Sequence, residues 1–182
     1  MRLTPDNPTQ GLTMDMTFAN EANVRIRPIR PDDQPRLVAL YERLSPTTRY
    51  QRFFSAAPQL SSSWARRLAN VDYCSRLALV AEHEVDGRPE LIGVSRYEAT
   101  AEDAAEVAVV VEDGWQRKGL GTILINELLQ AAERRGFRQY RAYVLPDNGA
   151  VLRLLHRAGA VLERKTEQGV MEVVFVRRTH AA

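Results

Sequence analysis

The sequence predicts an α/β fold in which a mixed sheet carries helices on both faces. Three observations lead to this fold class: strand-like segments occur before and between helical patterns, a valine-rich segment runs into a long amphipathic helix through glycines, and two extended segments end the chain. Of the 182 residues, 45% are hydrophobic, which is ample for one core and short for two. We therefore expect a single domain over residues 21–180.

The amino-terminal part is expected to contribute one strand and three helices. Residues 1–20 are polar, contain prolines and a glycine and show no hydrophobic period, so we expect a flexible tail there. A strand is predicted at 24–29, because charged and apolar residues alternate. Three helical patterns follow, from Asp32 or Asp33 to Leu44, over 47–54 and over 61–69.

The rest of the chain alternates strands and helices. Two apolar segments, 77–81 and 91–95, flank an Asp86-Gly87 pair and are predicted to form a β-hairpin. The remaining elements are the valine-rich strand at 105–111, a long helix from Leu120, a strand at 140–145, a helix at Asn148 and a final strand pair at 160–164 and 171–176. No internal repeat or low-complexity tract interrupts this order.

The turn between the valine strand and the long helix is the segment most informative about function. The first backbone N–H groups of a helix have no intrahelical partner, and the helix macrodipole adds partial positive charge there. Gly119 and Gly121 allow a ligand to approach the backbone closely, and Arg117 and Lys118 add cationic side chains. The turn therefore predicts an anion site, and a phosphate group suits it.

Residue identity excludes two common glycine-loop sites. Gly114 and Gly119 have the spacing of a P-loop, but that loop continues with Lys-Ser/Thr, whereas Leu120 and Gly121 follow here. A dinucleotide-binding fingerprint requires a third glycine three residues after Gly121, and Leu124 stands there. The turn is therefore neither a P-loop nor a dinucleotide-binding loop.

The spacing Gln116-x-x-Gly119-x-Gly121 resembles the Gln/Arg-x-x-Gly-x-Gly/Ala signature of the GNAT superfamily of N-acetyltransferases. A second segment, which begins at Asn148, is similar to the second CoA-binding helix of that family. The two segments stand at the separation found in the family. As an order of elements, the resemblance extends over residues 23–178.

The resemblance implies a GNAT fold, whose mostly antiparallel mixed sheet splays apart between strands 4 and 5. Here these are the valine strand and the strand after the long helix. The pantetheine arm of acetyl-CoA is then expected between them, bound by main-chain groups. The turn is expected to hold the pyrophosphate, and Asn148 to cap its helix, contact CoA or do both. The residues implied to bind acetyl-CoA are Val109, Val111, Gln116, Arg117, Lys118, Gly119, Gly121, Thr122 and Asn148.

Acetyl transfer requires a neutral amine, because an ammonium has no lone pair to attack the thioester carbonyl. A free lysine has a pKa of about 10.4, so a base or a desolvating site must remove its proton. Glu106 is the candidate base, because it interrupts an apolar strand, where burial raises a carboxyl pKa. Alternation places it on the face of Ala108 and Val110, and similar glutamates act as general base in several GNAT enzymes. An edge-exposed or salt-bridged glutamate is the structural alternative.

One position departs from the family pattern. Many GNAT enzymes carry a tyrosine seven residues after the helix asparagine, where it protonates the departing thiolate, and here that residue is Leu155. Leucine donates no proton, so water, another side chain or unassisted departure must replace the tyrosine. The neighbouring His156 points about 100° away on a helix, so we expect it at the surface.

The early helices indicate an acceptor. The segment 44–55, the strand around Glu106 and the pair Asp147-Asn148 look like the catalytic domain of Pat-type bacterial protein lysine acetyltransferases. This resemblance implies a protein lysine as the acceptor. The side chains expected to line the acceptor site, with core or surface positions as the alternative, are Arg49, Arg52, Phe53 and Phe54.

Composition argues against several other classes of protein. The formal net charge of +2 is nearly balanced and the arginines are dispersed, so no nucleic-acid partner is expected. Cys74 is the only cysteine, which excludes an intramolecular disulfide and a zinc site of several cysteines, and we expect no metal. No segment approaches the roughly 18 apolar residues of a membrane span, and the amino terminus lacks an apolar signal core. A cytoplasmic monomer or homodimer is expected.

Together these observations predict an acetyl-CoA-dependent N-acetyltransferase that acts by direct attack in a ternary complex, with a protein lysine as the preferred acceptor. Two alternatives stay open. In the first, the acceptor is a small amine or amino acid. In the second, the chain is a module that binds acyl-CoA without turnover, which the missing tyrosine permits.

Overall fold

The computed structural model describes residues 8–19, 21–57 and 59–178. Its strands are β1 (Met14–Thr17), β2 (Asn23–Pro28), β3 (Arg76–Val85), β4 (Arg88–Ala99), β5 (Ala104–Val111), β6 (Gln139–Val144), β7 (Gly159–Glu167) and β8 (Val170–Arg177). Its helices are α1 (Gln34–Arg43), α2 (Pro46–Phe53), α3 (Ser62–Ala69), α4 (Leu120–Arg134) and α5 (Gly149–Ala158), with the 3-10 turns η1 (Pro31–Asp33) and η2 (Asp113–Trp115). Every element predicted from residue 24 onward is present.

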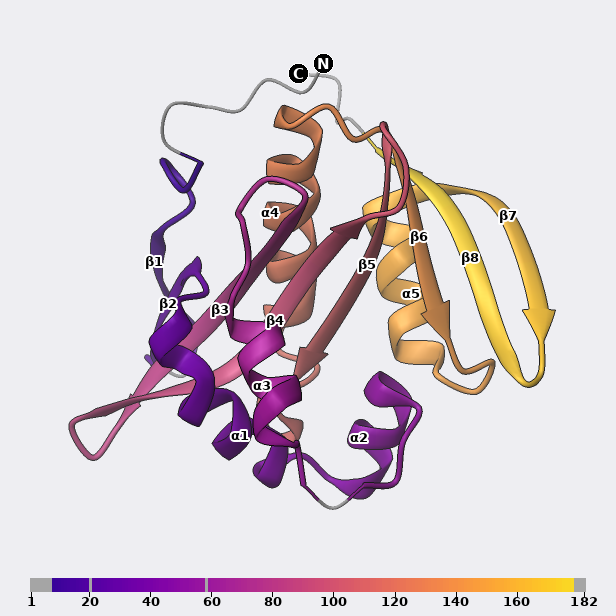
Figure 1. Cartoon of the computed structure of the whole chain (residues 1–182). Coiled ribbons are helices and arrows are strands. Elements are labelled where there is room, and N and C mark those ends of the chain that lie inside the picture. Colours follow the sequence, from indigo (N-terminus) through magenta and orange to yellow (C-terminus); the bar gives the residue numbers. More distant parts are fainter. Residues whose placement is uncertain (1–7, 20, 58, 179–182) are drawn as a thin grey trace.

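The described strands form one eight-stranded sheet in the order β1-β2-β3-β4-β5-β6-β8-β7 (Figure 1). Each neighbouring pair is antiparallel except β5 and β6, which run parallel. The prediction of a mixed, mostly antiparallel sheet is therefore confirmed.

Turn and cap residues explain where several elements begin. Asp86 and Gly87 both have positive φ, 50° and 75°, as a tight two-residue hairpin requires, and they join β3 to β4. Ser45 and Ser61 precede α2 and α3, and each side chain accepts a hydrogen bond from a backbone N–H of the first turn.

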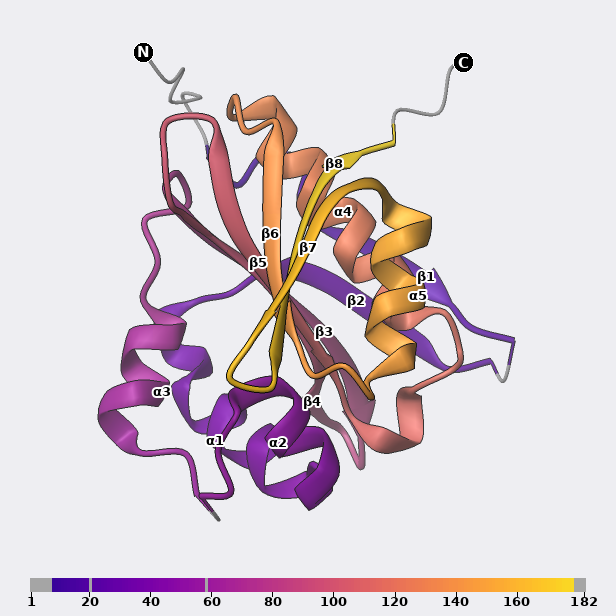
Figure 2. The ribbon, with the colours of Figure 1, turned by 90° about the vertical axis from the view of Figure 1, so that its right-hand side faces the viewer.

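The two faces of the sheet carry different helices (Figure 2). α4 and α5 cover one face and enclose the larger hydrophobic core, whereas α1 and α3 cover the other face. β5 serves both cores, because Val107 and Val111 pack into the larger one and Val110 into the other. The predicted alternation is confirmed, and it puts Glu106 and Ala108 on the face of α1.

α4 packs directly against the sheet. Leu120, Leu124 and Leu128 are fully buried, and each such side chain stabilises the fold by about 1.5–3 kcal/mol relative to exposure. Gly93 on β4 permits the close approach, because a Cβ atom there would lie 2.9 Å from Cδ1 of Leu124. This contact holds α4 close to β4.

The flexible tail predicted for residues 1–20 is wrong at Met14–Thr17, which form β1 and pair with β2. Met14, Met16 and Phe18 alternate with polar residues and pack against the larger core, a period of two that the surrounding polar sequence obscures. Residues 1–7 and 20 lie outside the described part of the chain, as do the last residues of the domain predicted to end at 180.

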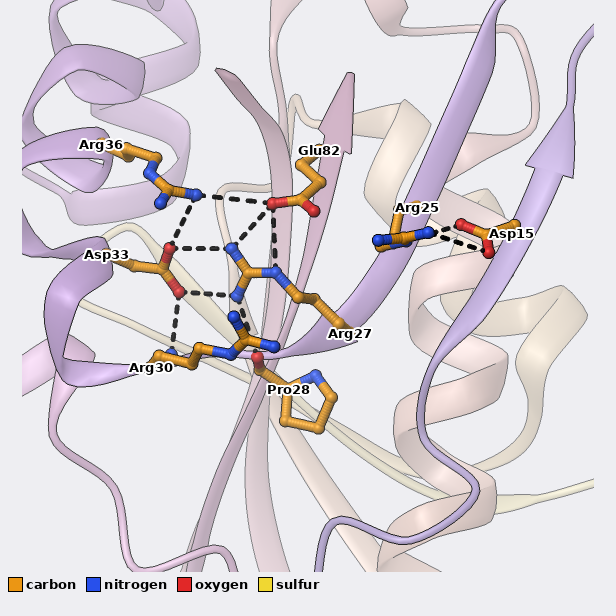
Figure 3. A network of polar contacts seen from close by, with 8 residues as sticks. All are labelled: Asp15, Arg25, Arg27, Pro28, Arg30, Asp33, Arg36 and Glu82. Atoms are coloured by element: carbon orange, nitrogen blue, oxygen red, sulfur yellow. Dashed lines mark hydrogen bonds and ion pairs between the residues drawn. The ribbon is translucent and has the colours of Figure 1, made fainter. Parts of the chain in front are cut away.

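A buried polar network attaches the start of α1 to the sheet (Figure 3). Both terminal nitrogens of Arg27 on β2 bind Asp33, at 2.7 and 2.8 Å, and the same guanidinium binds Glu82 on β3 at 2.7 Å. Asp33 also accepts the backbone N–H of Arg30, and Arg36 lies within 3.5 Å of both carboxylates. α1 leads directly into α2, so this network helps to position α2 over the sheet.

Candidate active site

A cavity of about 330 Å³ lies where β5 and β6 separate. Their pairing is limited to Ala104–Glu106 with Gln139–Arg141, after which the two strands diverge, as Figure 1 shows. The cavity is lined by β5, β6, α2, α5 and the turn before α4. The predicted splay is thereby confirmed, and it opens a space between two strands.

Main-chain polar groups of β5 face this cavity. The carbonyl of Val110 points toward β4, because it would lie 3.3 Å from a Cβ atom built on Gly93 of that strand. The backbone N–H of Glu112, two residues later, also donates to β4. Successive residues of a strand direct their N–H and C=O groups to opposite sides, so those of Val109 and Val111 face β6. The Val111 carbonyl accepts a hydrogen bond from Nε2 of Gln116 at 3.0 Å.

The backbone of the turn before α4 is suited to an anion. Gly119 is the N-cap of α4 with a left-handed φ of 91°, and Arg117 has φ of 60°. No side chain caps this helix start, so its first N–H groups have no side-chain acceptor within the described chain. A Cβ atom on Gly121 would point toward Val111 and Leu154, both of which line the cavity.

The predicted cofactor residues are distributed as follows. Those that line the cavity are Val109, Val111, Gln116, Arg117, Gly119, Gly121, Thr122 and Asn148. Lys118 does not line it, because its ammonium lies over the Trp115 ring, 5.2 Å from the ring centre. Six positions predicted from two separate motifs and two from the valine strand thus meet at one cavity.

A hydrogen-bond network ties α2 to this turn. Asp113, which precedes the turn, accepts hydrogen bonds from the backbone N–H and hydroxyl of Ser45 at 2.9 and 2.7 Å and from the Thr48 hydroxyl at 2.8 Å. Nε2 of Gln116 donates to the same Thr48 oxygen at 3.3 Å. These bonds hold the start of α2 against the turn at the edge of the cavity.

α5 begins at the cavity and contributes its first residues to the lining. The Asn148 side chain accepts the N–H of Val151 at 3.2 Å, so the predicted N-cap is confirmed. Leu155 is buried and also lines the cavity. His156 is exposed and contacts Arg164 on β7, as expected for a surface residue.

Glu106 lies on the wall of the cavity. It belongs to the last residue pair that joins β5 to β6 before the strands separate. Its side chain is exposed, yet desolvation by the surrounding strands and α2 raises its pKa above the ordinary value. The positive charge of Arg52 opposes that rise, the negative charge of Glu98 adds to it, and the charge of Arg141 opposes it. A carboxyl with a raised pKa at a cavity wall is suited to accept a proton near neutral pH.

Two of the four predicted acceptor-site residues line the cavity, namely Arg52 and Phe54. Arg49 instead caps the end of α1, where it donates to the carbonyls of Leu44 and Glu42 at 2.9 and 2.8 Å. Phe53 packs into the cores beneath α1 and α3. Arg49 and Phe53 therefore do not line the cavity, and Phe53 has the core position that the alternative predicted.

Several residues that line the cavity were not predicted from the sequence. Tyr143 on β6 and Gln51 on α2 belong to no sequence motif. Tyr143 can be assigned to the cavity only once the separation of β5 and β6 is known. Arg153 and Arg157 also line the cavity from α5, and their spacing of four places them on one helix face. That spacing was a signal in the sequence for a basic face near the cofactor motif.

Within the described ranges, no group of three or more His, Cys, Asp or Glu side chains is arranged to hold a metal ion. None of the helices described is both long and apolar enough to cross a membrane.

We expect Gly119→Ala to weaken acetyl-CoA binding by about tenfold or more, because an L-residue at φ 91° strains the helix start and displaces the backbone N–H groups that are expected to bind the pyrophosphate. Gly136→Ala is the matched control, because Gly136 has a similar φ of 94° and open space around it but lies at the other end of α4. Both variants should lose similar stability to urea, and titration calorimetry should show weaker binding in Gly119→Ala alone. Equal affinity in the two variants would contradict the assignment of the turn.

Comparison with known proteins gives consistent matches. A family model described as the acetyltransferase (GNAT) domain matches residues 23–161. The chain is 34% identical over 152 residues to the acetyltransferase PA5475 of Pseudomonas aeruginosa, a match that covers 83% of this chain and 82% of that protein. The chain is also 31% identical over 153 residues to the acetyltransferase Pat of Mycolicibacterium smegmatis. This match covers 83% of this chain but 45% of Pat. The crystal structure of the GNAT domain of S. lividans PAT is similar with a TM-score of 0.80 and 32% identity, and covers 92% of this chain and 98% of that one.

Proposed function

The chain belongs to the GNAT acetyltransferase family, and from this premise we propose that it transfers the acetyl group of acetyl-CoA directly to the side chain of a protein lysine. We assign this activity to a single domain over residues 21–180. The observation that carries the proposal is the cavity between β5 and β6, which joins an anion-binding turn at one end to a carboxyl of raised pKa on its wall.

The lining of the cavity fits acetyl-CoA. The main-chain groups of Val109 that face the gap suit the amides of the pantetheine arm, which can replace a neighbouring strand. The turn from Gln116 to Thr122 suits the pyrophosphate, because a helix start without a side-chain cap leaves N–H donors for an anion. Arg117, at the cavity wall, adds a cation to that end.

In the proposed reaction, the amine nitrogen forms a bond to the acetyl carbon and the bond from that carbon to the CoA sulfur breaks. Glu106 takes the proton of the attacking amine, directly or through a water molecule. The thiolate of CoA leaves and takes a proton from solvent, because Leu155 donates none at the position where many members of the family carry tyrosine. No acetyl-enzyme forms in this scheme.

The choice of a protein lysine rests on similarity. The chain is similar to Pat of Mycolicibacterium smegmatis and to the GNAT domain of S. lividans PAT, and it resembles Pat-type lysine acetyltransferases in the segment that forms α2. The matched segment spans less than half of the Mycolicibacterium protein, so the proposal concerns the catalytic domain alone. Exposed Phe54 and Tyr143 at the cavity are suited to contact the aliphatic stem of a lysine.

A screen of thiol release tests this function. The chain is incubated with acetyl-CoA and either lysine-containing proteins, small amines or free amino acids, and the released CoA is measured with a thiol reagent. We expect release with protein acceptors and a mass increase of one acetyl group on a lysine. Release with small amines or free amino acids alone would show that the acceptor is a small molecule and not a protein lysine. Binding of acetyl-CoA without release for any acceptor would favour a non-catalytic module.

A further inference from the structure

Two arginine side chains lie next to each other beneath α2. Arg52 from α2 and Arg96 from β4 line a small cavity beside Val94 and Val110. Arg52 also lines the large cavity that contains Glu106. Arg52 therefore stands between the two cavities, with Arg96 behind it.

The positive charge of these two residues lacks a close anionic partner in the described part of the chain. Arg52 stacks over the Phe53 ring at 4.9 Å, and Arg96 donates to the carbonyl of Leu68 at 3.1 Å, but neither forms an ion pair with a carboxylate there. Arg27 is the contrasting case, because two carboxylates surround its buried guanidinium. Desolvated cations without an anion are costly, and a strongly perturbed pKa at a cavity marks a candidate functional site.

Electrostatics are consistent with this geometry. Burial lowers the pKa of Arg52 to about 10, and the negative charge of Glu106 only partly opposes this. Burial likewise lowers the pKa of Arg96 to about 9, to which the positive charges of Arg52 and Arg76 add, while Glu98 opposes. Burial of the two guanidinium groups therefore outweighs the attraction of both nearby glutamates.

We propose that Arg52 is an anion-binding residue of the acceptor site and that the preferred acceptor lysine has a carboxylate beside it, supplied by a neighbouring acidic residue. This inference rests on the proposed function and specifies its substrate class. Arg96 lies opposite Ala108 and Glu98 opposite Glu106 in the β4–β5 register, so all of these groups share one face of the sheet. A lysine amine at Glu106 then brings the flanking residues of its own chain toward Arg52.

The proposed cofactor site does not require Arg52. The proposed phosphate site is the turn before α4, with its own cation in Arg117, whereas Arg52 projects from α2 on the face that carries Glu106. A guanidinium is suited to a carboxylate, because its planar fork binds both oxygens.

Two peptides of equal length test the proposal, one with glutamate on both sides of a single lysine and one with glutamine at both positions. At fixed ionic strength, we expect wild-type kcat/KM to be about 10- to 100-fold higher for the glutamate peptide, the contribution of a charge-assisted hydrogen bond at a desolvated site. Arg52→Gln should bring the ratio close to one, and Arg52→Lys should restore part of it. Arg66→Gln, an exposed arginine on α3 outside both cavities, is the control that should keep the wild-type ratio.

Three results would overturn the inference. Equal kcat/KM for the two peptides in the wild type would show that no anion is recognised. Weaker acetyl-CoA binding in Arg52→Gln, measured by calorimetry, would assign the cation to the cofactor. A lower urea midpoint in Arg52→Gln would indicate a structural role, because loss of an uncompensated cation should leave stability equal or higher. Absence of transfer to either peptide would instead contradict the proposed function itself.

Discussion

Replacing Glu106 with glutamine is expected to lower kcat for acetyl transfer by about 10²- to 10⁴-fold, the usual contribution of a general base. Glutamine keeps the size and polarity of the side chain but cannot accept the amine proton at neutral pH. Acetyl-CoA binding should be unchanged, because the residues proposed to bind it lie on other parts of the cavity lining. Steady-state kinetics and calorimetry on the two proteins measure both quantities.

The pH profile gives the same prediction a second readout. Desolvation raises the pKa of Glu106, so wild-type kcat/KM should rise with pH as that carboxyl deprotonates, with a midpoint above the ordinary glutamate value. Glu98→Gln is the matched control, because the charge of Glu98 contributes to the raised pKa. That variant should stay active and shift the rise to lower pH. Full activity of Glu106→Gln across the pH range would show that another group takes the proton.

Replacing Arg27 with leucine is expected to destabilise the fold by about 3–5 kcal/mol, the cost of breaking a buried ion pair by removing one partner. Arg27 is 3% exposed and Asp33 is fully buried. Burial opposes the charge on Arg27, but its bonds to Asp33 and Glu82 raise its pKa overall. Without the guanidinium, two carboxylates would share the more exposed Arg36 as their cation (Figure 3). The midpoint of urea unfolding should fall with an unchanged slope.

Arg25→Leu is the control on the same strand, because Arg25 and Asp15 form an exposed ion pair, also drawn in Figure 3. Such a pair contributes about 0–1 kcal/mol, so this variant should stay close to wild type.

Burial acts to raise the pKa of Asp33, but its bonds to Arg27 and Arg30 lower it overall. The stabilisation is thus present above the ordinary pKa and is lost as pH falls through the lowered one, and Arg27→Leu should weaken this acid dependence. Similar unfolding midpoints for Arg27→Leu and Arg25→Leu would contradict a stabilising role of the buried network.

Local sequence signals predicted most of the fold. The period of β5, the Asp86-Gly87 hairpin and the Asn148 cap each depend on neighbouring residues, and each is confirmed. β1 was missed because a strand of four residues within a polar segment has too short a period to recognise. The Arg27 network was missed because Glu82 is 55 residues away in the chain.

The candidate site was predicted where it follows from a motif and missed where it depends on tertiary packing. Gln116 and Asn148 belong to two motifs and line one cavity. Arg49 and Arg52 are three residues apart on the same helix, yet one caps α1 and the other enters the cavity. Their difference depends on how α2 lies over the sheet, which the network of Asp113, Ser45 and Thr48 determines.

The most direct test of direct acetyl transfer is a set of initial velocities measured with acetyl-CoA and a lysine peptide varied together. Both substrates are proposed to occupy one cavity, with the amine at Glu106, so no acetyl-enzyme is needed. Double-reciprocal plots should therefore give lines that intersect. Parallel lines, together with an acetylated chain after incubation with acetyl-CoA alone, would contradict transfer in a ternary complex.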